Sequence, residues 1–143
     1  MDVTVRIGAE VGVGNRIAAV LQPVRAARLA EIKADIERNL GAEGFAIGTL
    51  AARHRLPVRT LQRLFEAEGS TFSEFLLERR LSRAHRMLGD ARLIDRPIGV
   101  IAFESGFTSQ PYFNRAFRAR FGAAPSEVRA QLRREHDASA RAR

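Results

Sequence analysis

Apolar residues recur every three or four positions from Val24 onward, which is the spacing of one buried face of an α-helix. The first such segment covers residues 25–40 and stops before Gly41, a residue type that commonly ends helices. Six further helical segments follow it: IGTLAARH, PVRTLQRLFEAEG, STFSEFLLERRLSRAHRML, IGVIAFES, SQPYFNRAFRARF and PSEVRAQLRR. The predicted fold class is all-α, with about seven helices.

The two ends of the chain differ from this pattern. Val3, Val5 and Ile7 alternate as in a β-strand, but no clear partner strand follows and glycines interrupt the alternation. Residues 1–23 are therefore predicted to be an N-terminal extension, and residues 24–136 the folded domain. The polar residues 137–143 are expected to form a short frayed tail.

The longest helical segment, STFSEFLLERRLSRAHRML, carries two apolar stripes. Thr71 and Glu74 have the spacing of a capping box at its start. The first stripe is Phe72, Phe75 and Leu76, and the second is Leu77, Leu81, Ala84 and Leu88. Because a helix with two apolar stripes can pack on two sides, this helix is predicted to bridge two subdomains.

A pattern occurs twice, once on each side of this helix. IGTLAARHRLPVRTLQRLF (47–65) and IGVIAFESGFTSQPYFNRAF (98–117) share Ile-Gly, an apolar residue and Ala in the first helix, and Arg and Phe in the second, with a turn one residue longer in the second copy. Each copy is predicted to be a helix-turn-helix, whose second helix commonly enters the DNA major groove. Ordinary helical hairpins would explain one copy, but two copies around a bridging helix favour DNA binding.

The second helix of each copy has an apolar face and a polar face. In the later copy Ser109 is a good N-cap and Pro111 falls in the first turn. Its core-facing residues are predicted to be Tyr112 or Phe113, with Ala116, Phe117 and Phe121; those of the earlier copy are Leu61, Leu64 and Phe65. The outward residues are then Gln110, Asn114, Arg115 and Arg118, with Arg59, Gln62 and Arg63 at matching places. Amide and guanidinium groups can read adenine and guanine edges, although a solvated surface side chain is the alternative for each.

Composition agrees with DNA binding without requiring it. The 143 residues carry a formal net charge of +8, and Lys33 is the only lysine among 24 basic residues. Arginine suits bidentate phosphate and guanine contacts, but arginine richness can also follow from the base composition of a genome. The sequence has no Cys, which excludes disulfides and thiolate sites. It shows no membrane span and no secretory signal, so the expected compartment is the cytoplasm, on the nucleoid.

Five motifs together are specific: RTLQRLF (59–65), FSEFLLERRLSRAHRML (72–88), IGVIAFESGF (98–107), YFNRAF (112–117) and FGAAPSEVR (121–129). By these motifs the chain resembles the DNA-binding domain of the AraC/XylS family of bacterial transcription regulators, over about residues 28–135. The resemblance implies two helix-turn-helix subdomains joined by a long helix. It also implies a sequence-specific transcription regulator whose two recognition helices enter successive major-groove segments. An activator is expected, and a repressor is the alternative that the sequence leaves open.

The predicted DNA-binding residues combine the outward faces with this resemblance. They are Arg59, Thr60, Gln62, Arg63, Ser109, Gln110, Tyr112, Asn114, Arg115 and Arg118. Some positions depart from the family pattern. Leu56 and Pro57 stand where a hydroxyl N-cap is usual, the turn RHRLP lacks the usual Gly, and Ala124 and Val128 replace Thr and Tyr. These departures put the geometry of the first turn in doubt.

Family members usually carry a sensor or dimerisation domain before this one. The chain is thus either a stand-alone regulator or a fragment of a longer one, and the fragment is favoured because VTVRIGAEVGVG has no obvious burial partner. Residues 1–23 would then be a remnant of the sensor domain. A monomer suffices for two recognition helices, and a dimer would form through the missing domain. The expected partners are double-stranded DNA and, secondarily, RNA polymerase.

Other chemistry finds little support in the sequence. GVGNR lacks the Gly-Lys-Ser/Thr ending of a phosphate-binding loop. His54, His85 and His136 have no metal-ligand spacing; the first two are expected on helix surfaces, with His54 a candidate phosphate contact. No cofactor, metal or enzymatic activity is predicted. The alternatives kept open are a targeting module for an enzyme and a protein-interaction module.

Overall fold

The computed structural model describes residues 21–143, so the predicted alternation of Val3, Val5 and Ile7 lies outside the described residues. The described chain is all-α, as predicted. A helix over residues 21–38 is followed by α2 (Ile47–Arg53), α3 (Val58–Glu66), α4 (Phe72–Leu88), the 3₁₀ turn η1 (Ala91–Leu93), α5 (Ile98–Glu104), α6 (Gln110–Phe121) and α7 (Pro125–Arg141).

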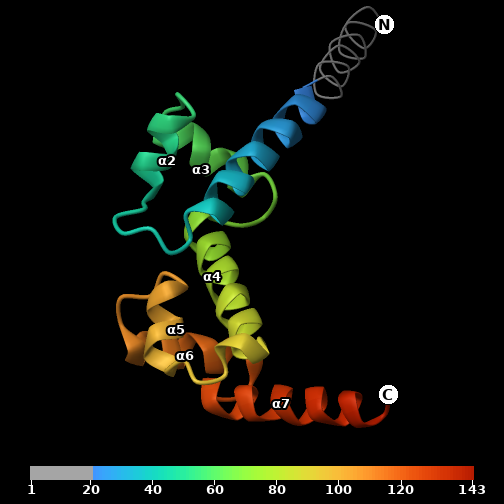
Figure 1. The fold of residues 1–143 in the computed structure, drawn as a ribbon. Coiled ribbons are helices and arrows are strands. Elements are labelled where there is room, and N and C mark those ends of the chain that lie inside the picture. Colours follow the sequence, from blue (N-terminus) through green and yellow to red (C-terminus); the bar gives the residue numbers. More distant parts are fainter. Residues whose placement is uncertain (1–20) are drawn as a thin grey trace, which may run out of the picture.

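Two subdomains lie at the two ends of α4 (Figure 1). The first contains the 21–38 helix, α2 and α3, and the second contains α5, α6 and α7. The core of the first is built from Leu29, Ile32, Ile36, Leu40, Phe45, Leu50, Ala51, Leu61, Phe65, Phe72 and Leu76. The core of the second is built from Leu81, Ala84, Leu88, Ile101, Ala102, Phe107, Phe113 and Phe117.

The helix α4 divides its residues between these cores as its two stripes predict. Phe72 and Leu76 are buried in the first core with Phe75 packed against it, whereas Leu81, Ala84 and Leu88 are buried in the second with Leu77 beside it. At its start the Thr71 hydroxyl accepts a hydrogen bond from the Glu74 backbone N–H at 3.1 Å. The role of α4 as a bridge between two subdomains is confirmed.

The C-terminal segment differs from its prediction. The helix α7 continues to Arg141, although residues 137–143 were expected to be frayed. Its end is exposed on every side, so no core contact holds the last turns. The run from Gln131 to Arg141 contains no Gly or Pro, and the Gln131 amide donates to Glu135 at 3.0 Å within the helix. Local side-chain pairs of this kind support an exposed helix.

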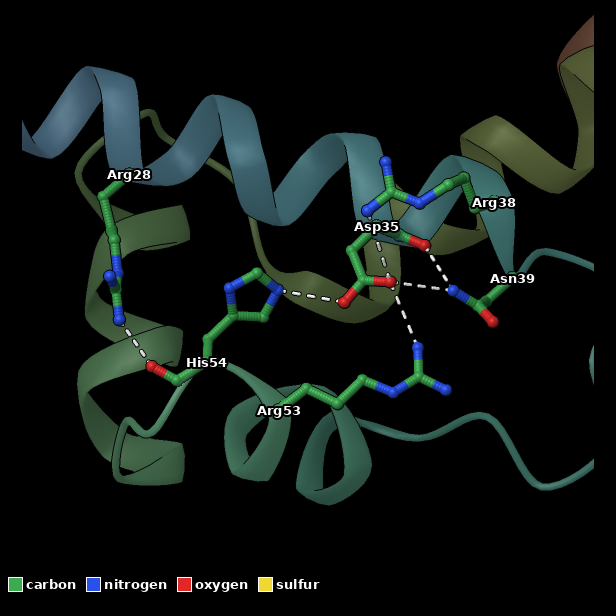
Figure 2. A network of polar contacts seen from close by, with 6 residues as sticks. All are labelled: Arg28, Asp35, Arg38, Asn39, Arg53 and His54. Carbon is green, nitrogen blue, oxygen red and sulfur yellow. Dashed lines mark hydrogen bonds and ion pairs between the residues drawn. The ribbon is translucent and has the colours of Figure 1, made fainter.

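The turn of the first helix-turn-helix forms without glycine. Arg55 occupies the left-handed region at φ 55°, where Gly is usual. Pro57 is the N-cap residue of α3 and provides no side-chain hydrogen bond. A buried carboxylate holds the turn instead (Figure 2). Asp35 is 7% exposed, and its carboxylate accepts hydrogen bonds from Asn39 at 2.8 Å and Arg53 at 3.1 Å.

The last residue of this network corrects one expectation. The Nε2 atom of His54 lies 3.0 Å from the second carboxylate oxygen of Asp35, and the His54 side chain is only 15% exposed. Arg28 donates a hydrogen bond to the His54 carbonyl. His54 therefore belongs to the scaffold of the turn rather than to its surface, and the expectation of a surface histidine was wrong.

Replacing Asp35 with Asn is expected to lower the free energy of unfolding by about 1–3 kcal/mol. The change keeps the shape but removes the charge that three basic side chains contact, Arg38, Arg53 and His54, so these side chains lose a charged partner. Urea unfolding followed by circular dichroism would measure the loss. The matched control is Glu31→Gln, since Glu31 is exposed on the same helix. Equal stability of the two variants would contradict the role given to Asp35.

Candidate nucleic-acid interface

The second helices of the two units, α3 and α6, bury one face and expose the other. In α3, Leu61 and Phe65 are buried, at 0% and 1% exposure. In α6, Phe113 and Phe117 are both fully buried, while Tyr112 is 46% exposed. The choice left open by the sequence is thereby decided: Phe113 faces the core and Tyr112 faces outward.

The residues at the two ends of α6 define where the helix begins and ends. The Ser109 hydroxyl accepts a hydrogen bond from the Tyr112 backbone N–H at 3.3 Å, as expected for an N-cap. Pro111 lies in the first turn. Gly122 ends the helix in the left-handed conformation at φ 81°. The exposed face of α6 is thus carried by a helix with defined ends over a filled aromatic core.

Nine of the ten residues predicted to bind DNA are exposed. Thr60 is the exception and is half-buried. The exposed residues are Arg59, Gln62 and Arg63 on α3, Ser109 before α6, and Gln110, Tyr112, Asn114, Arg115 and Arg118 on α6. Their side chains are therefore accessible, as the prediction of DNA-binding residues requires.

Four of these residues line one hollow of about 430 Å³ beside α6. They are Gln110, Asn114, Arg115 and Arg118, and the opposite side is formed by Ile98 and by Ala124, Pro125 and Ser126 at the start of α7. A smaller hollow, of about 250 Å³, borders α3. Gln62 lines it with Ile47, Glu66, Thr71, Phe72 and Ser73. Arg59 and Arg63 lie on the exposed face of α3 and are not part of that hollow.

The arginines of the structure separate into two groups. Several form ion pairs within the scaffold: Arg79 pairs with Glu37, Arg96 with Glu104 at 2.6 Å, and Arg120 with Glu78 at 2.8 Å. By contrast, Arg59, Arg63, Arg115 and Arg118 form no ion pair or side-chain hydrogen bond with any group between residues 21 and 143. The carboxylates of these pairs belong to the scaffold, whereas the four arginines on the exposed faces of α3 and α6 are unpaired among residues 21–143.

Two features of this surface were not found from the sequence. Ser126 and Ile98 border the hollow beside α6, but neither belongs to the repeat's outward pattern. The short motif Ala124-Pro125-Ser126 at a helix start was the available indication for Ser126.

His85, expected on a helix surface, instead packs against Phe121 with ring centroids 4.6 Å apart.

Comparison with known proteins agrees with this geometry. The family model described as "Helix-turn-helix domain" matches residues 50–131. A solved structure from Chromobacterium violaceum, a transcriptional regulator described by its AraC-type DNA-binding domain, is 32% identical with a TM-score of 0.67, over 80% of this chain and 96% of that chain.

The chain belongs to the AraC-type helix-turn-helix family of transcription regulators. The resemblance drawn from its motifs is confirmed. The transcriptional activator RhrA of Rhizobium meliloti is 41% identical over 105 residues, which are 71% of this chain and 32% of RhrA. The chain therefore spans about a third of that relative's length.

A further AraC-type relative has been solved with its nucleic acid. The DNA-binding domain of AdpA, described as a global transcriptional factor in complex with a target DNA, is 31% identical with a TM-score of 0.65, over 75% of this chain and 94% of that one. In the present chain, no helix between residues 21 and 143 is both long and apolar enough to cross a bilayer.

Proposed function

We propose that this AraC-type chain binds one face of a promoter duplex by placing α3 and α6 in successive major-groove segments. The observation that carries the proposal is the set of unpaired arginines, Arg59 and Arg63 on one helix and Arg115 and Arg118 on the other. Arginine side chains and amides are the groups that contact phosphates and read base edges in the major groove. In this proposal Gln62, Gln110 and Asn114 supply amide contacts, with Thr60, Ser109 and Tyr112 bordering them.

The dimensions of the bridge suit this arrangement. The helix α4 has 17 residues, which correspond to about 26 Å at the α-helical rise. Recognition helices in adjacent major grooves are about 34 Å apart between centres. Adding roughly half a helix width at each end brings the two lengths together. A single chain then spans both groove segments, so a monomer is sufficient for binding.

The proposed outcome of binding is activation of transcription. RhrA, which is 41% identical over 71% of this chain, is named as an activator. RNA polymerase is the partner that an activator bound at a promoter would contact. In this proposal the chain itself performs no chemistry, and a dimer would require a domain beyond the described residues.

Electrophoretic mobility shifts at two salt concentrations test this function. Duplexes enriched by the wild-type chain from a randomised library are compared with the unselected library. We expect tight binding to the enriched duplexes, weak binding to the library, and a steep loss of both as salt rises, because arginine contacts release counterions from DNA. A protein-interaction module would bind neither DNA, and that result would contradict the proposal.

A further inference from the structure

A contact between the two subdomains is built around the middle of α4. The Nε atom of Arg80 donates a hydrogen bond to the backbone carbonyl of Leu40 at 3.1 Å. Leu40 lies just beyond the helix over residues 21–38 and is buried in the first core. Arg80 thereby joins the bridging helix to the end of a first-subdomain helix.

The second subdomain approaches the same place through glycine. Gly106, which follows α5, has φ 105°, a conformation that favours glycine. A Cβ atom added to Gly106 would lie 2.2 Å from the Leu40 carbonyl oxygen and 2.5 Å from Arg80 Nε. A Cβ on Gly41 would lie 2.5 Å from the carbonyl oxygen of Glu104, at the end of α5. The two backbones therefore approach each other with no room for a side chain, and the Arg80 side chain lies beside this contact.

The charge of Arg80 suits this position. The 21–38 helix and α5 both end here, and helix C-termini present unpaired carbonyls with partial negative charge. Arg80 is half-buried, and desolvation lowers its pKa from the ordinary arginine value. Between residues 21 and 143 no carboxylate pairs with it, and its side chain instead donates to the Leu40 carbonyl of the first subdomain.

We propose that Arg80 is a positioning residue that fixes the orientation of α3 relative to α6 and so sets the spacing of the two DNA segments that the protein accepts. The inference rests on the proposed function for its effect on DNA. Its structural part, a single fixed orientation of the two subdomains, holds without DNA. If α4 alone joined the two subdomains, each could rotate about the apolar stripe of α4 on which it packs. The contact at Arg80, where the two subdomains meet, restricts that rotation.

Binding to DNA tests the effect on spacing. Arg80→Met removes the guanidinium and keeps an unbranched apolar chain. On duplexes enriched by the wild-type chain we expect Arg80→Met to bind about tenfold more weakly than the wild type. When one base pair is inserted between the two contacted segments, we expect the variant to lose less affinity than the wild type loses. Each inserted pair rotates them by about 35°, which a rigid protein tolerates poorly. Arg80→Lys, which can still donate to the Leu40 carbonyl, should restore most of both properties.

Arg86→Met is the matched control, because Arg86 is exposed on the same helix and its side chain forms no hydrogen bond or ion pair among residues 21–143. It should keep the wild-type penalty for the inserted pair. A variant Arg80→Met with the wild-type affinity and the wild-type penalty would overturn the inference while leaving the proposed function intact. Failure of the wild-type chain to enrich any duplex would instead count against the proposed function.

A distance measurement tests the orientation in the absence of DNA. The sequence has no Cys, so spin labels can be placed at Ala52→Cys on α2 and Ala119→Cys on α6, both exposed. We expect one narrow distance distribution by double electron–electron resonance, and a broader one after Arg80→Met. A broad distribution in the labelled chain with Arg80 intact would overturn the inference, even if the Arg80→Met variant failed to fold.

Discussion

Replacing Phe113 with Ala is expected to lower the free energy of unfolding by about 3–5 kcal/mol. Phe113 has no exposed surface, and its ring lies 4.8 Å from that of Phe107 and 5.5 Å from that of Phe117 between centroids. The substitution removes a large apolar side chain and leaves a cavity between α5, α6 and α4. Since small domains are stable by only about 5–15 kcal/mol, this single change should remove a large part of the stability.

Urea unfolding followed by circular dichroism measures this loss, and the neighbouring residue provides the control. Tyr112 is adjacent in sequence but 46% exposed, so Tyr112→Ala should cost less than about 1 kcal/mol of unfolding free energy. The account would be contradicted if the two substitutions were equally destabilising, because the inward and outward faces of α6 would then be wrongly assigned.

Replacing both Arg63 and Arg115 with Ala is expected to weaken binding to the enriched duplexes by about 2–6 kcal/mol. Each substitution alone should cost about 1–3 kcal/mol, and the two should add because the residues lie in different subdomains. Neither side chain contributes an ion pair to the described part of the fold, so the thermal stability should stay unchanged. Titration by fluorescence anisotropy would measure the affinities.

Substitution of an arginine outside α3 and α6 distinguishes the loss of a specific base or phosphate contact from the loss of net positive charge. Arg134 is exposed near the end of α7 and interacts with Gln131 of its own helix at 2.8 Å. Arg134→Ala removes the same charge from a helix other than α3 and α6, and we expect it to lower the affinity only slightly. Equal losses from all three arginines would mean that affinity depends on net charge and that the assigned faces are wrong.

Much of the fold could be predicted because the apolar spacing within each helix is a local pattern and the helix-turn-helix pattern occurs twice. The apolar spacing in residues 25–40 and in α4 reports which side of each helix is buried, and the cores contain those residues. The repeat then aligned α3 with α6, so that the inward Phe65 and Phe117 identified the outward faces by elimination. Tyr112 and Phe113 could not be distinguished because both are aromatic and one residue apart, and their burial in the folded domain decided between them: Phe113 is fully buried, whereas Tyr112 is 46% exposed.

The remaining features depend on contacts between residues far apart in sequence. Asp35 lies on the 21–38 helix and His54 lies in the turn after α2, and nothing in the local spacing of either segment indicates that they meet. The same is true of Arg80 and the Leu40 carbonyl, which is a backbone group and leaves no trace in the sequence. The close approach at Gly106 was compatible with an ordinary turn glycine until the positions of Leu40 and Arg80 were known.

The central claim is that α3 and α6 contact two DNA segments one duplex turn apart on the same face. Base preferences of Arg63→Ala and Arg115→Ala, determined by selection from the randomised library beside the wild-type chain, test it most directly. We expect each variant to relax the preference at one position or a short adjacent cluster, with the two clusters about ten base pairs apart. Relaxation of both variants at the same position, or at positions half a turn apart, would contradict the account.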